Sequence, residues 1–290
     1  MSKENRYQEY DTWAWLYNQT MGPEYSKSQL QPIETLLLPK IAKNTKVLDV
    51  CCGTGHLVQL LSEKGYQMTG LDGSEAMLTY ASKNAPQAQF ILDDARTFEL
   101  PPIFDAVFST SASLNHIMSI DELKQVFERV YAALKENGLF LFDLNHPNQM
   151  TKWWTGGIAE GEITSNYAWA IASRYYPQDN TGYFKVILFQ APTNQTNPLK
   201  LPKLLLYKLL NLRILTRLRL KVLARFSQWE KNWQSSEITY HVKGYPHAEV
   251  ESALIAAGFS DIELRTLEGD NTIDENHSVY FICHKAKKCH

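Results

Sequence analysis

The constraint that most limits the fold is a regular alternation of short apolar segments with helix-like segments between Lys46 and Leu144. Such alternation predicts a parallel sheet with helices on both faces. We expect strands over residues 46–51, 67–71, 89–92, 104–109 and 139–144. We expect helices over residues 56–64, 74–84 and 121–135. Asp121 should cap the last helix, and Gly138 should stop it.

The rest of the chain departs from this alternation and then returns to it. The aromatic segment from Tyr7 to Leu38 predicts helices broken at Gly22-Pro23 and at Pro32. After Pro147, two stretches rich in Trp, Tyr, Ile and Val predict an antiparallel sheet laid over the parallel one. These stretches cover residues 162–190 and 226–243. A final helix over 247–257, stopped by Gly258, and strands over 262–267 and 279–284 should close the first sheet.

Composition excludes several classes of protein. The 290 residues carry a net charge of -2, which gives no bulk attraction for nucleic acid, and no nucleic-acid partner is expected. The four cysteines lack the CxxC spacing of a zinc site, so we expect reduced thiols and no metal. No signal region and no long apolar span are present, which predicts a cytoplasmic protein.

Residues 47–57, VLDVCCGTGHL, place a glycine turn between a strand and a helix. Ligands of open α/β sheets bind at this edge, where backbone N–H groups face the ligand. Asp72 ends the next strand about twenty residues later, where a carboxylate accepts hydrogen bonds from ribose hydroxyls. Asp93-Asp94-Ala95 ends the third strand, in position for an adenine amino group. A nicotinamide enzyme fits poorly because GTG lacks the third glycine of GxGxxG.

These segments together closely resemble the class I S-adenosylmethionine-dependent methyltransferases. The matching motifs are VLDVCCGTGHL, LDGSEAML, FILDDAR and FDAVFSTSASLNHI, with LIAAGFSDIEL in the closing hairpin. The resemblance implies a doubly wound, Rossmann-like sheet of seven strands with a closing antiparallel hairpin. It also implies S-adenosyl-L-methionine as cofactor and S-adenosyl-L-homocysteine as product.

The resemblance also indicates which residues contact the cofactor. They are Tyr25, Asp49, Cys51, Gly53, Thr54, Gly55, Asp72, Gly73, Ser74, Met77, Asp93, Asp94, Ala95, Thr110 and Ser113. Asp49 either orients the loop amides and the cofactor amino group or caps the following turn. Cys51 should be a small residue buried at the strand end and Cys52 should shape the backbone. No base flanks them, which speaks against a catalytic thiol.

Two short patterns indicate the kind of acceptor. Residues 109–113 read STSAS, without the proline-rich signature of enzymes that methylate bases or side-chain amides. Ser113-Leu114-Asn115-His116 and the N-terminal YDTWAWLYNQTMGPEY resemble the branch of glycine N-methyltransferase and the amino-sugar N-methyltransferases. That branch methylates small molecules and inserts an antiparallel sheet after the fifth strand. An amine nitrogen is therefore the preferred acceptor, with oxygen next.

The same branch suggests three regions in the chain. Residues 1–45 would form an N-terminal helical lid, and residues 46–146 with 244–290 the cofactor-binding core. Residues 147–243 would form the inserted sheet and substrate cap, including a basic helical insert at 198–225. The acceptor pocket should lie between the strand ends and this inserted sheet.

Several side chains are candidates for the chemistry. His116 is either the general base or a histidine that shapes its loop, and His146 is either a second base or part of a turn. Tyr17 is a catalytic candidate on the lid; like Tyr10 and Tyr25 it could instead be core. The substrate candidates are four aromatic residues, Tyr10, Trp153, Trp169 and Trp229.

The insert is dense in leucine and in basic residues. No acidic residue occurs between Asn180 and Gln228, while eight lysines and arginines lie between Lys200 and Arg225. One or two amphipathic helices broken near Pro202 are expected. They would lie on an anionic membrane surface, cap a lipophilic substrate, or pack their leucines on the inserted sheet. Unrelieved repulsion between the cations predicts that 198–225 is mobile in the isolated protein.

Two other functions remain open from the sequence. One is methylation of a lipophilic or quinone-like acceptor at a membrane surface. The other is a non-catalytic regulator that binds S-adenosylmethionine. The identity of the acceptor, the number of methyl groups and the oligomeric state are likewise open.

Overall fold

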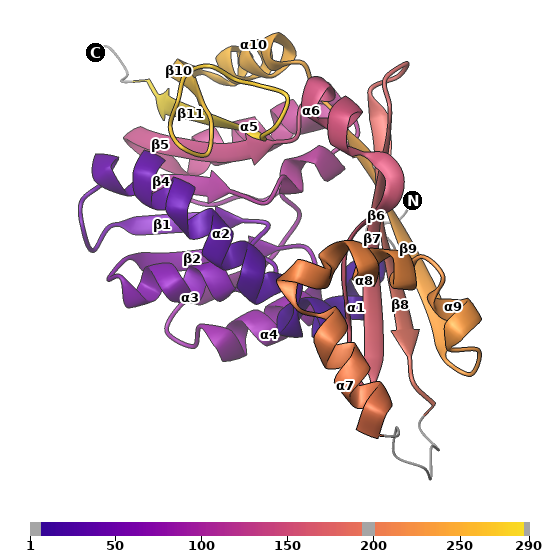
Figure 1. Cartoon of the computed structure of the whole chain (residues 1–290). Coiled ribbons are helices and arrows are strands. Elements are labelled where there is room, and N and C mark those ends of the chain that lie inside the picture. The colour runs from indigo at the N-terminus through magenta and orange to yellow at the C-terminus, as the bar shows by residue number, and fades with distance from the viewer. Residues whose placement is uncertain (1–6, 193–200, 287–290) are drawn as a thin grey trace. The chain divides into compact units, whose positions relative to one another are not determined.

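The computed structural model describes residues 7–192 and 201–286. Contacts within the chain divide it into two units (Figure 1). The first unit comprises Met1–Gln149 and Gly244–His290, and the second comprises Met150–Lys243. No helix in the described residues is long and apolar enough to cross a membrane.

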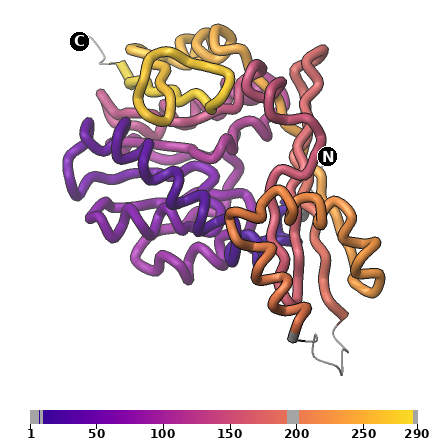
Figure 2. The backbone as a smooth tube through the Cα atoms, in the orientation of Figure 1, coloured from indigo at the N-terminus to yellow at the C-terminus, as the bar shows by residue number. Residues whose placement is uncertain are grey.

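A sheet of seven strands forms the centre of the first unit, in the order β10-β11-β5-β4-β1-β2-β3. The strands are β1 (Lys46–Val50), β2 (Gln67–Asp72), β3 (Gln89–Leu92), β4 (Phe104–Ser109), β5 (Leu134–Leu144), β10 (Phe259–Arg265) and β11 (Val279–Lys285). The strands from β3 across to β5 run parallel, whereas β11 runs antiparallel to β5 and β10 antiparallel to β11. Figure 2 shows this late hairpin returning beside β5.

Helices cover both faces of this sheet. They are α1 (Gln8–Gln19), α2 (Met21–Leu36), α3 (His56–Glu63), α4 (Glu75–Asn84), α5 (Ile120–Ala133) and α10 (His247–Ala257). Two short 3₁₀ helices, η2 (Leu38–Lys40) and η3 (Ser113–His116), belong to the same unit. One apolar core contains Val126 of α5 and Leu254 of α10, and the other contains Ile33 of α2 and Val58 of α3. The predicted doubly wound fold is confirmed.

The boundary between α5 and β5 differs from the prediction. Ser119, not Asp121, caps α5, because its hydroxyl accepts a hydrogen bond of 3.1 Å from the N–H of Glu122. Asp121 lies in the first turn, where a negative charge suits the helix dipole. The helix ends at Ala133 because Leu134 already pairs with Phe104 in the sheet. Gly138, the predicted helix stop, therefore lies inside β5.

Both predicted breaks near the N-terminus are also displaced. The chain turns at Thr20, and Pro23 lies in the first turn of α2, where a missing N–H loses no helical hydrogen bond. Pro32 lies inside α2 and does not end it. The buried side chains of Ile33 and Leu37 hold this part of the chain in the second apolar core.

The second unit is built on an antiparallel sheet with strand order β6-β7-β8-β9. The strands are β6 (Thr155–Ile163), β7 (Tyr167–Tyr176), β8 (Thr181–Gln190) and β9 (Gln234–Lys243). Its helices are α7 (Leu201–Leu210), η4 (Arg213–Leu215), α8 (Thr216–Leu223) and α9 (Phe226–Trp229), and α6 (Pro147–Trp153) spans the boundary between the units. Phe226 was predicted to start a strand. It starts α9 instead, because its buried ring packs 4.8 Å from that of Phe189.

The basic insert is ordered where the structure describes it, so the prediction of a mobile segment is wrong from Leu201 onward; residues 198–200 lie outside the described part. Tyr207, Leu210 and Leu223 are buried in one cluster with residues of the sheet. The helices separate after Asn211, not at Pro202. Asn211 accepts a hydrogen bond from the N–H of Ile163 at 3.2 Å and donates to its carbonyl at 2.7 Å. This packing outweighs the repulsion between cations.

Candidate active site

The glycine turn after β1 has an unusual backbone. Cys51, Gly53 and Gly55 all have positive φ angles, of 67°, 53° and 72°. Glycine adopts this left-handed region without steric cost. Packing imposes a second requirement, because a Cβ on Gly55 would lie 2.8 Å from the Cβ of Ala81. The turn therefore brings bare backbone to the start of α3, at the carboxyl edge of the parallel strands.

Asp72 ties this turn to the next helix. One carboxylate oxygen accepts a hydrogen bond of 2.8 Å from the N–H of Gly53, and the other accepts one of 2.9 Å from the N–H of Ser74. A carboxylate has about four acceptor positions. The N–H of Gly73 bonds this carboxylate as well. An acceptor position therefore remains, and the contact with a ribose stays a prediction.

Asp49 lies beside Asp72 at the ends of two adjacent strands and is 2% exposed. None of the described residues donates a hydrogen bond to its carboxylate. Burial, and then the charge of Asp72, raise the pKa of Asp49 well above its usual value, and burial also raises the pKa of Asp72. Repulsion between two nearby carboxylates is relieved by protonation of one of them or by a nearby cation. A ligand with a sulfonium and an ammonium group supplies such a cation, so these residues fit S-adenosylmethionine.

The two cysteines shape the backbone. Their N–H groups both donate to the carbonyl of Leu71, at 2.8 and 3.0 Å. Cys51 is half-buried rather than fully buried, and the Sγ of Cys52 lies 2.7 Å from where a Cβ of Gly70 would be. Burial, and then Asp72, raise the pKa of both thiols well above its usual value. Neither is a thiolate at neutral pH, so neither is a nucleophile.

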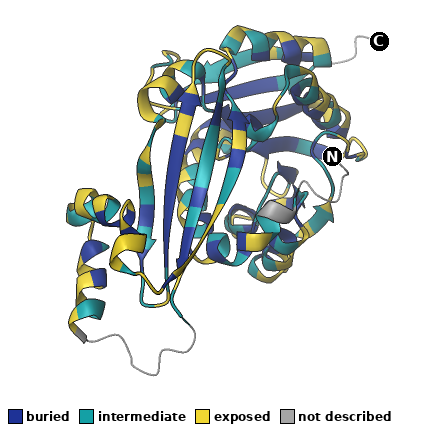
Figure 3. Cartoon of the chain, turned by 90° about the vertical axis from the view of Figure 1, so that its right-hand side faces the viewer, coloured by how far each residue is buried: buried dark blue, intermediate teal, exposed yellow. Residues whose placement is uncertain are grey.

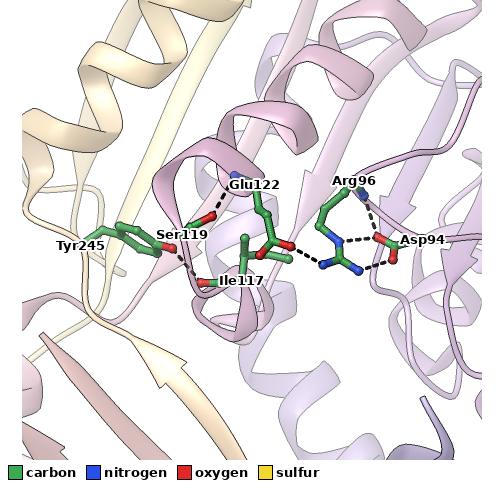
Figure 4. Close-up of polar contacts among 6 residues, drawn as sticks. All are labelled: Asp94, Arg96, Ile117, Ser119, Glu122 and Tyr245. Atoms are coloured by element: carbon green, nitrogen blue, oxygen red, sulfur yellow. Dashed lines mark hydrogen bonds and ion pairs between the residues drawn. The ribbon is translucent and has the colours of Figure 1, made fainter. Parts of the chain in front are cut away.

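Arg96 organises the predicted adenine site (Figure 4). The Oδ1 of Asp94 accepts hydrogen bonds from the backbone N–H of Arg96 at 2.9 Å and from its Nε at 2.8 Å. The Nη2 of Arg96 pairs with the other oxygen, and its Nη1 lies 2.7 Å from Glu122. The N–H of Asp94 donates to Asp93 at 2.7 Å. No role was predicted for Arg96 from the sequence, although its position two residues after the carboxylate in FILDDAR was an available signal.

Helix α1 is bonded directly to the loop after β2, and through Asn84 to the glycine turn. Asp11 accepts hydrogen bonds from the Ser74 hydroxyl at 2.5 Å and from the N–H of Ala76 at 3.2 Å. Asn84 donates at 2.7 Å to Asn18 and at 2.8 Å to the carbonyl of Thr54. Asp11 and Asn18 could not be predicted from the sequence, because their partners lie more than sixty positions away.

Aromatic residues of the N-terminal segment lie against the same loops. The Tyr7 ring covers Gly73, where a Cβ would come within 2.2 Å, and its hydroxyl bonds Asp94. Tyr17 lies beside Gly53, with its ring 6.4 Å from that of Tyr25. Burial raises the pKa of Tyr17, which keeps its hydroxyl protonated as a hydrogen-bond donor.

The loop after β4 carries Thr110, Ser113 and His116. The rings of His116 and Tyr10 meet edge to face with centroids 6.1 Å apart. The structure therefore brings two of the predicted chemical residues together.

Three sets of hydrogen bonds fix this loop. Ala112, at a φ of 54°, donates to Asp143 at 3.0 Å. The amide of Asn115 exchanges two hydrogen bonds of 2.9 Å with the backbone of Asn145. The hydroxyl of Tyr245 donates at 2.7 Å to the carbonyl of Ile117 (Figure 4). Burial raises the pKa of Asp143 to about 7.

His146 holds another loop in place. Its Nε2 donates to the carbonyl oxygens of Asp274 and His277, at 3.0 and 3.2 Å. Its ring lies 4.8 Å from that of His247. Burial lowers the pKa of both histidines, that of His247 to about 4. The role of His146 as a base stays a prediction.

The other candidates have these positions. Thr54 is buried with its hydroxyl 3.0 Å from His56, Met77 is buried on α4, and Ala95 is buried after β3. In the second unit, Trp169 is buried and donates to Glu162 at 3.4 Å, whereas Trp153 and Trp229 are exposed. A contact of these tryptophans with an acceptor stays a prediction.

The sequence has relatives among known methyltransferases. Residues 47–138 match the family model described as a methyltransferase domain. A putative methyltransferase of Geobacillus sp. (strain WCH70) is 35% identical over 43% of this chain and 53% of its own length. A dTDP-3-amino-3,4,6-trideoxy-alpha-D-glucopyranose N,N-dimethyltransferase of Streptomyces venezuelae is 31% identical over 46% of this chain and 52% of its own. The chain thus spans about half the length of these relatives.

One further relative and two solved structures match more widely. An uncharacterized methyltransferase of Synechocystis sp. is 35% identical over 52% of this chain and 69% of its own length. An S-adenosylmethionine-dependent methyltransferase from Clostridium acetobutylicum has a TM-score of 0.68 at 16% identity, covering 96% of this chain and 99% of that one. DesVI of Streptomyces venezuelae has a TM-score of 0.65 at 20% identity, covering 93% and 96%. The chain belongs to the class I S-adenosylmethionine-dependent methyltransferase family.

Proposed function

We propose that the chain transfers a methyl group from S-adenosylmethionine to an amine nitrogen of a small molecule. The observation that supports the methyl donor is the pair of carboxylates behind the glycine turn, of which Asp49 is buried and Asp72 is half-buried. Asp72 keeps an acceptor position for the ribose, Asp49 accepts no hydrogen bond from a described residue, and Arg96 fixes Asp94 at the end of β3, where the adenine is expected. When bound, the donor supplies an electrophilic methyl on a positive sulfur.

Helix α1 would act as a lid in this proposal. Asp11 bonds the loop after β2, Asn18 reaches the glycine turn through Asn84, and Tyr17 lies against Gly53. A helix in this position excludes water and aligns the acceptor, which supplies much of the rate of a displacement reaction.

The amine acceptor rests on the resemblance to amino-sugar enzymes and on the loop after β4. An amine must lose a proton at some stage of its methylation. An imidazole is the side chain best suited to accept a proton near neutral pH, which makes His116 the candidate base. Tyr10 lies at its edge, where an amine carried by a sugar or another small scaffold would enter.

The decisive experiment measures S-adenosylhomocysteine formed from S-adenosylmethionine with paired acceptors. A nucleotide-linked 3-amino sugar is compared with its 3-hydroxy counterpart. We expect product with the amine and at least about tenfold less with the hydroxyl, because the alcohol proton is far harder to remove. Equal or greater turnover of the hydroxyl compound would contradict the nitrogen assignment.

A conservative variant of Asp49 tests the binding of S-adenosylmethionine independently of the acceptor. Asp49→Asn keeps the size of the side chain but removes its charge, so affinity for S-adenosylmethionine should fall by about tenfold or more. S-adenosylhomocysteine lacks the sulfonium charge and should lose less. A folded Asp49→Asn protein that binds both as tightly as the wild type would refute the charge argument.

A further inference from the structure

Helices α7 and α8 carry two apolar faces, of which only one is used in the fold. Tyr207, Leu210, Val222 and Leu223 are buried in the cluster on the sheet. A second set faces outward, and we call it the leucine face: Leu205, Leu206, Leu209, Leu212, Ile214 and Leu218. Its leucines are 43% to 53% exposed and Ile214 is 88% exposed. Figure 3 colours the chain by burial and shows exposed stretches, in yellow, along the helices next to the grey trace. So much adjacent apolar surface on one helical pair marks an interaction site.

Exposed cations are interleaved with the leucine face. Lys208, Arg213, Arg217 and Lys221 are all exposed, and none forms an ion pair with a described residue. Two other cations of the same segment are engaged. Lys203 lies 2.6 Å from Glu230, and Arg219 donates to the carbonyl of Leu210 at 3.3 Å. The four free cations are therefore not needed to hold the helices in place.

The helical pair is preformed on its own sheet. Asn211 is bonded to both backbone groups of Ile163, and Tyr207 is bonded to Glu230, which also holds Lys203. These contacts fix the inward face and orient the leucine face outward. Little conformational entropy remains to be lost when this face binds a partner.

We propose that the leucine face and its four cations bind the surface of an anionic phospholipid membrane. Apolar side chains gain by leaving water at the acyl boundary, while lysine and arginine gain from anionic headgroups. A second copy of the chain fits less well, because a two-fold contact would bring like cations together. The absence of acidic residues in the sequence from 180 to 228 gives the surface a single sign of charge.

Sedimentation of the full chain with vesicles tests this proposal. One set of vesicles is phosphatidylcholine alone, and the other contains phosphatidylglycerol as the anionic lipid. We expect binding to the anionic set only, weakening steeply as salt rises. Absence of binding to anionic vesicles at low salt would overturn the proposal, and so would equal binding to both sets.

Three variants separate charge from apolar contact. The combination Lys208→Gln, Arg213→Gln, Arg217→Gln and Lys221→Gln should weaken binding by roughly 10²-fold or more, since each cation contributes about fivefold. Leu209→Ser with Ile214→Ser should also weaken binding, by at least about tenfold, although every charge remains. A matched control replaces four exposed lysines elsewhere, Lys27, Lys40, Lys43 and Lys152, by glutamine.

The outcomes are distinct. The control should bind vesicles like the wild type; a loss equal to that of the first variant would mean only a general charge effect and would overturn the proposal. If the leucine face instead forms a dimer, the wild type will show a concentration-dependent mass that the Leu209→Ser, Ile214→Ser variant lacks, without vesicle binding. All variants should bind S-adenosylmethionine unchanged, which shows that they are folded. This proposal does not depend on the identity of the acceptor.

Discussion

The backbone N–H and the guanidinium of Arg96 both donate hydrogen bonds to the Asp94 carboxylate. The same guanidinium forms an ion pair with Glu122 at the start of α5. Arg96 and Asp94 are both about one tenth exposed, so water screens the pair little. The adenine end of the candidate site is thereby fixed to a helix of the apolar core.

Replacing Arg96 should therefore weaken the binding of S-adenosylmethionine, although Arg96 is not itself a predicted contact of this cofactor. We expect Arg96→Gln, and almost as much Arg96→Lys, to lower affinity for S-adenosylmethionine by about tenfold, because lysine cannot form the two-pronged contact. Calorimetry measures the affinity. Arg129→Gln, which removes only an exposed pair with Glu99, is the control and should change nothing. Equal affinities of the Arg96 variants and the control would show that Asp94 needs no support.

Asp72→Ala tests the ribose assignment. The variant loses the ribose contacts together with the bonds to Gly53 and Ser74, and we expect a loss of roughly 2 to 4 kcal/mol in donor binding. Circular dichroism should confirm that the variant is folded before calorimetry is interpreted. Unchanged affinity in a folded protein would exclude Asp72 from the site.

His116→Asn tests the proposed base. Turnover should fall by about 10² or more while donor affinity stays constant, because only proton removal is affected. His146→Asn is an informative comparison: its Nε2 holds two carbonyl groups, so this variant should lower the melting temperature more than the turnover. A loss of less than about tenfold for His116→Asn would mean that alignment suffices and that His116 only shapes its loop.

The raised pKa of Asp143 predicts that the stability of the folded protein depends on pH. Its pKa is raised to about 7 in the folded protein from an ordinary value of 3.8, so the folded state favours the protonated form. Stability should therefore fall as pH rises between about 4 and 7, by up to roughly 4 kcal/mol from this group. Asp143→Asn can still accept the bond from Ala112 and should flatten that fall. Denaturant unfolding of both proteins at pH 4.5 and 7 measures it, and parallel slopes would contradict the assignment.

Local patterns in the sequence were sufficient for much of this architecture. The residues of β3, β4 and α10 coincide with the predicted ranges, since apolar periodicity and the Gly258 stop act over short distances. The boundary at Leu134 was missed because pairing with Phe104, a contact across the sheet, decided it.

In the candidate site, too, local patterns predicted some residues, whereas residues held by distant contacts were missed. The carboxylates Asp72 and Asp94 were predicted from the sequence because spacing places them at the ends of their strands. Their supports were not found. Asp11 and Asn18 have partners more than sixty positions away, and no local pattern indicates them. The exposed leucines of α7 could not be predicted either. Periodicity shows that a helix is amphipathic, but it does not show which of its residues the sheet covers.

The loop that carries His116 is held by residues from much later in the chain. Asp143 lies 31 positions from its partner in the loop, Asn145 lies 30, and Tyr245 lies 128. Closing the longest of these connections costs the most chain entropy, so it forms late in folding. During synthesis, the donor-binding motifs at residues 47–95 leave the ribosome well before Tyr245. The residues that are predicted to bind S-adenosylmethionine can thus reach their native arrangement before the loop that carries His116 does.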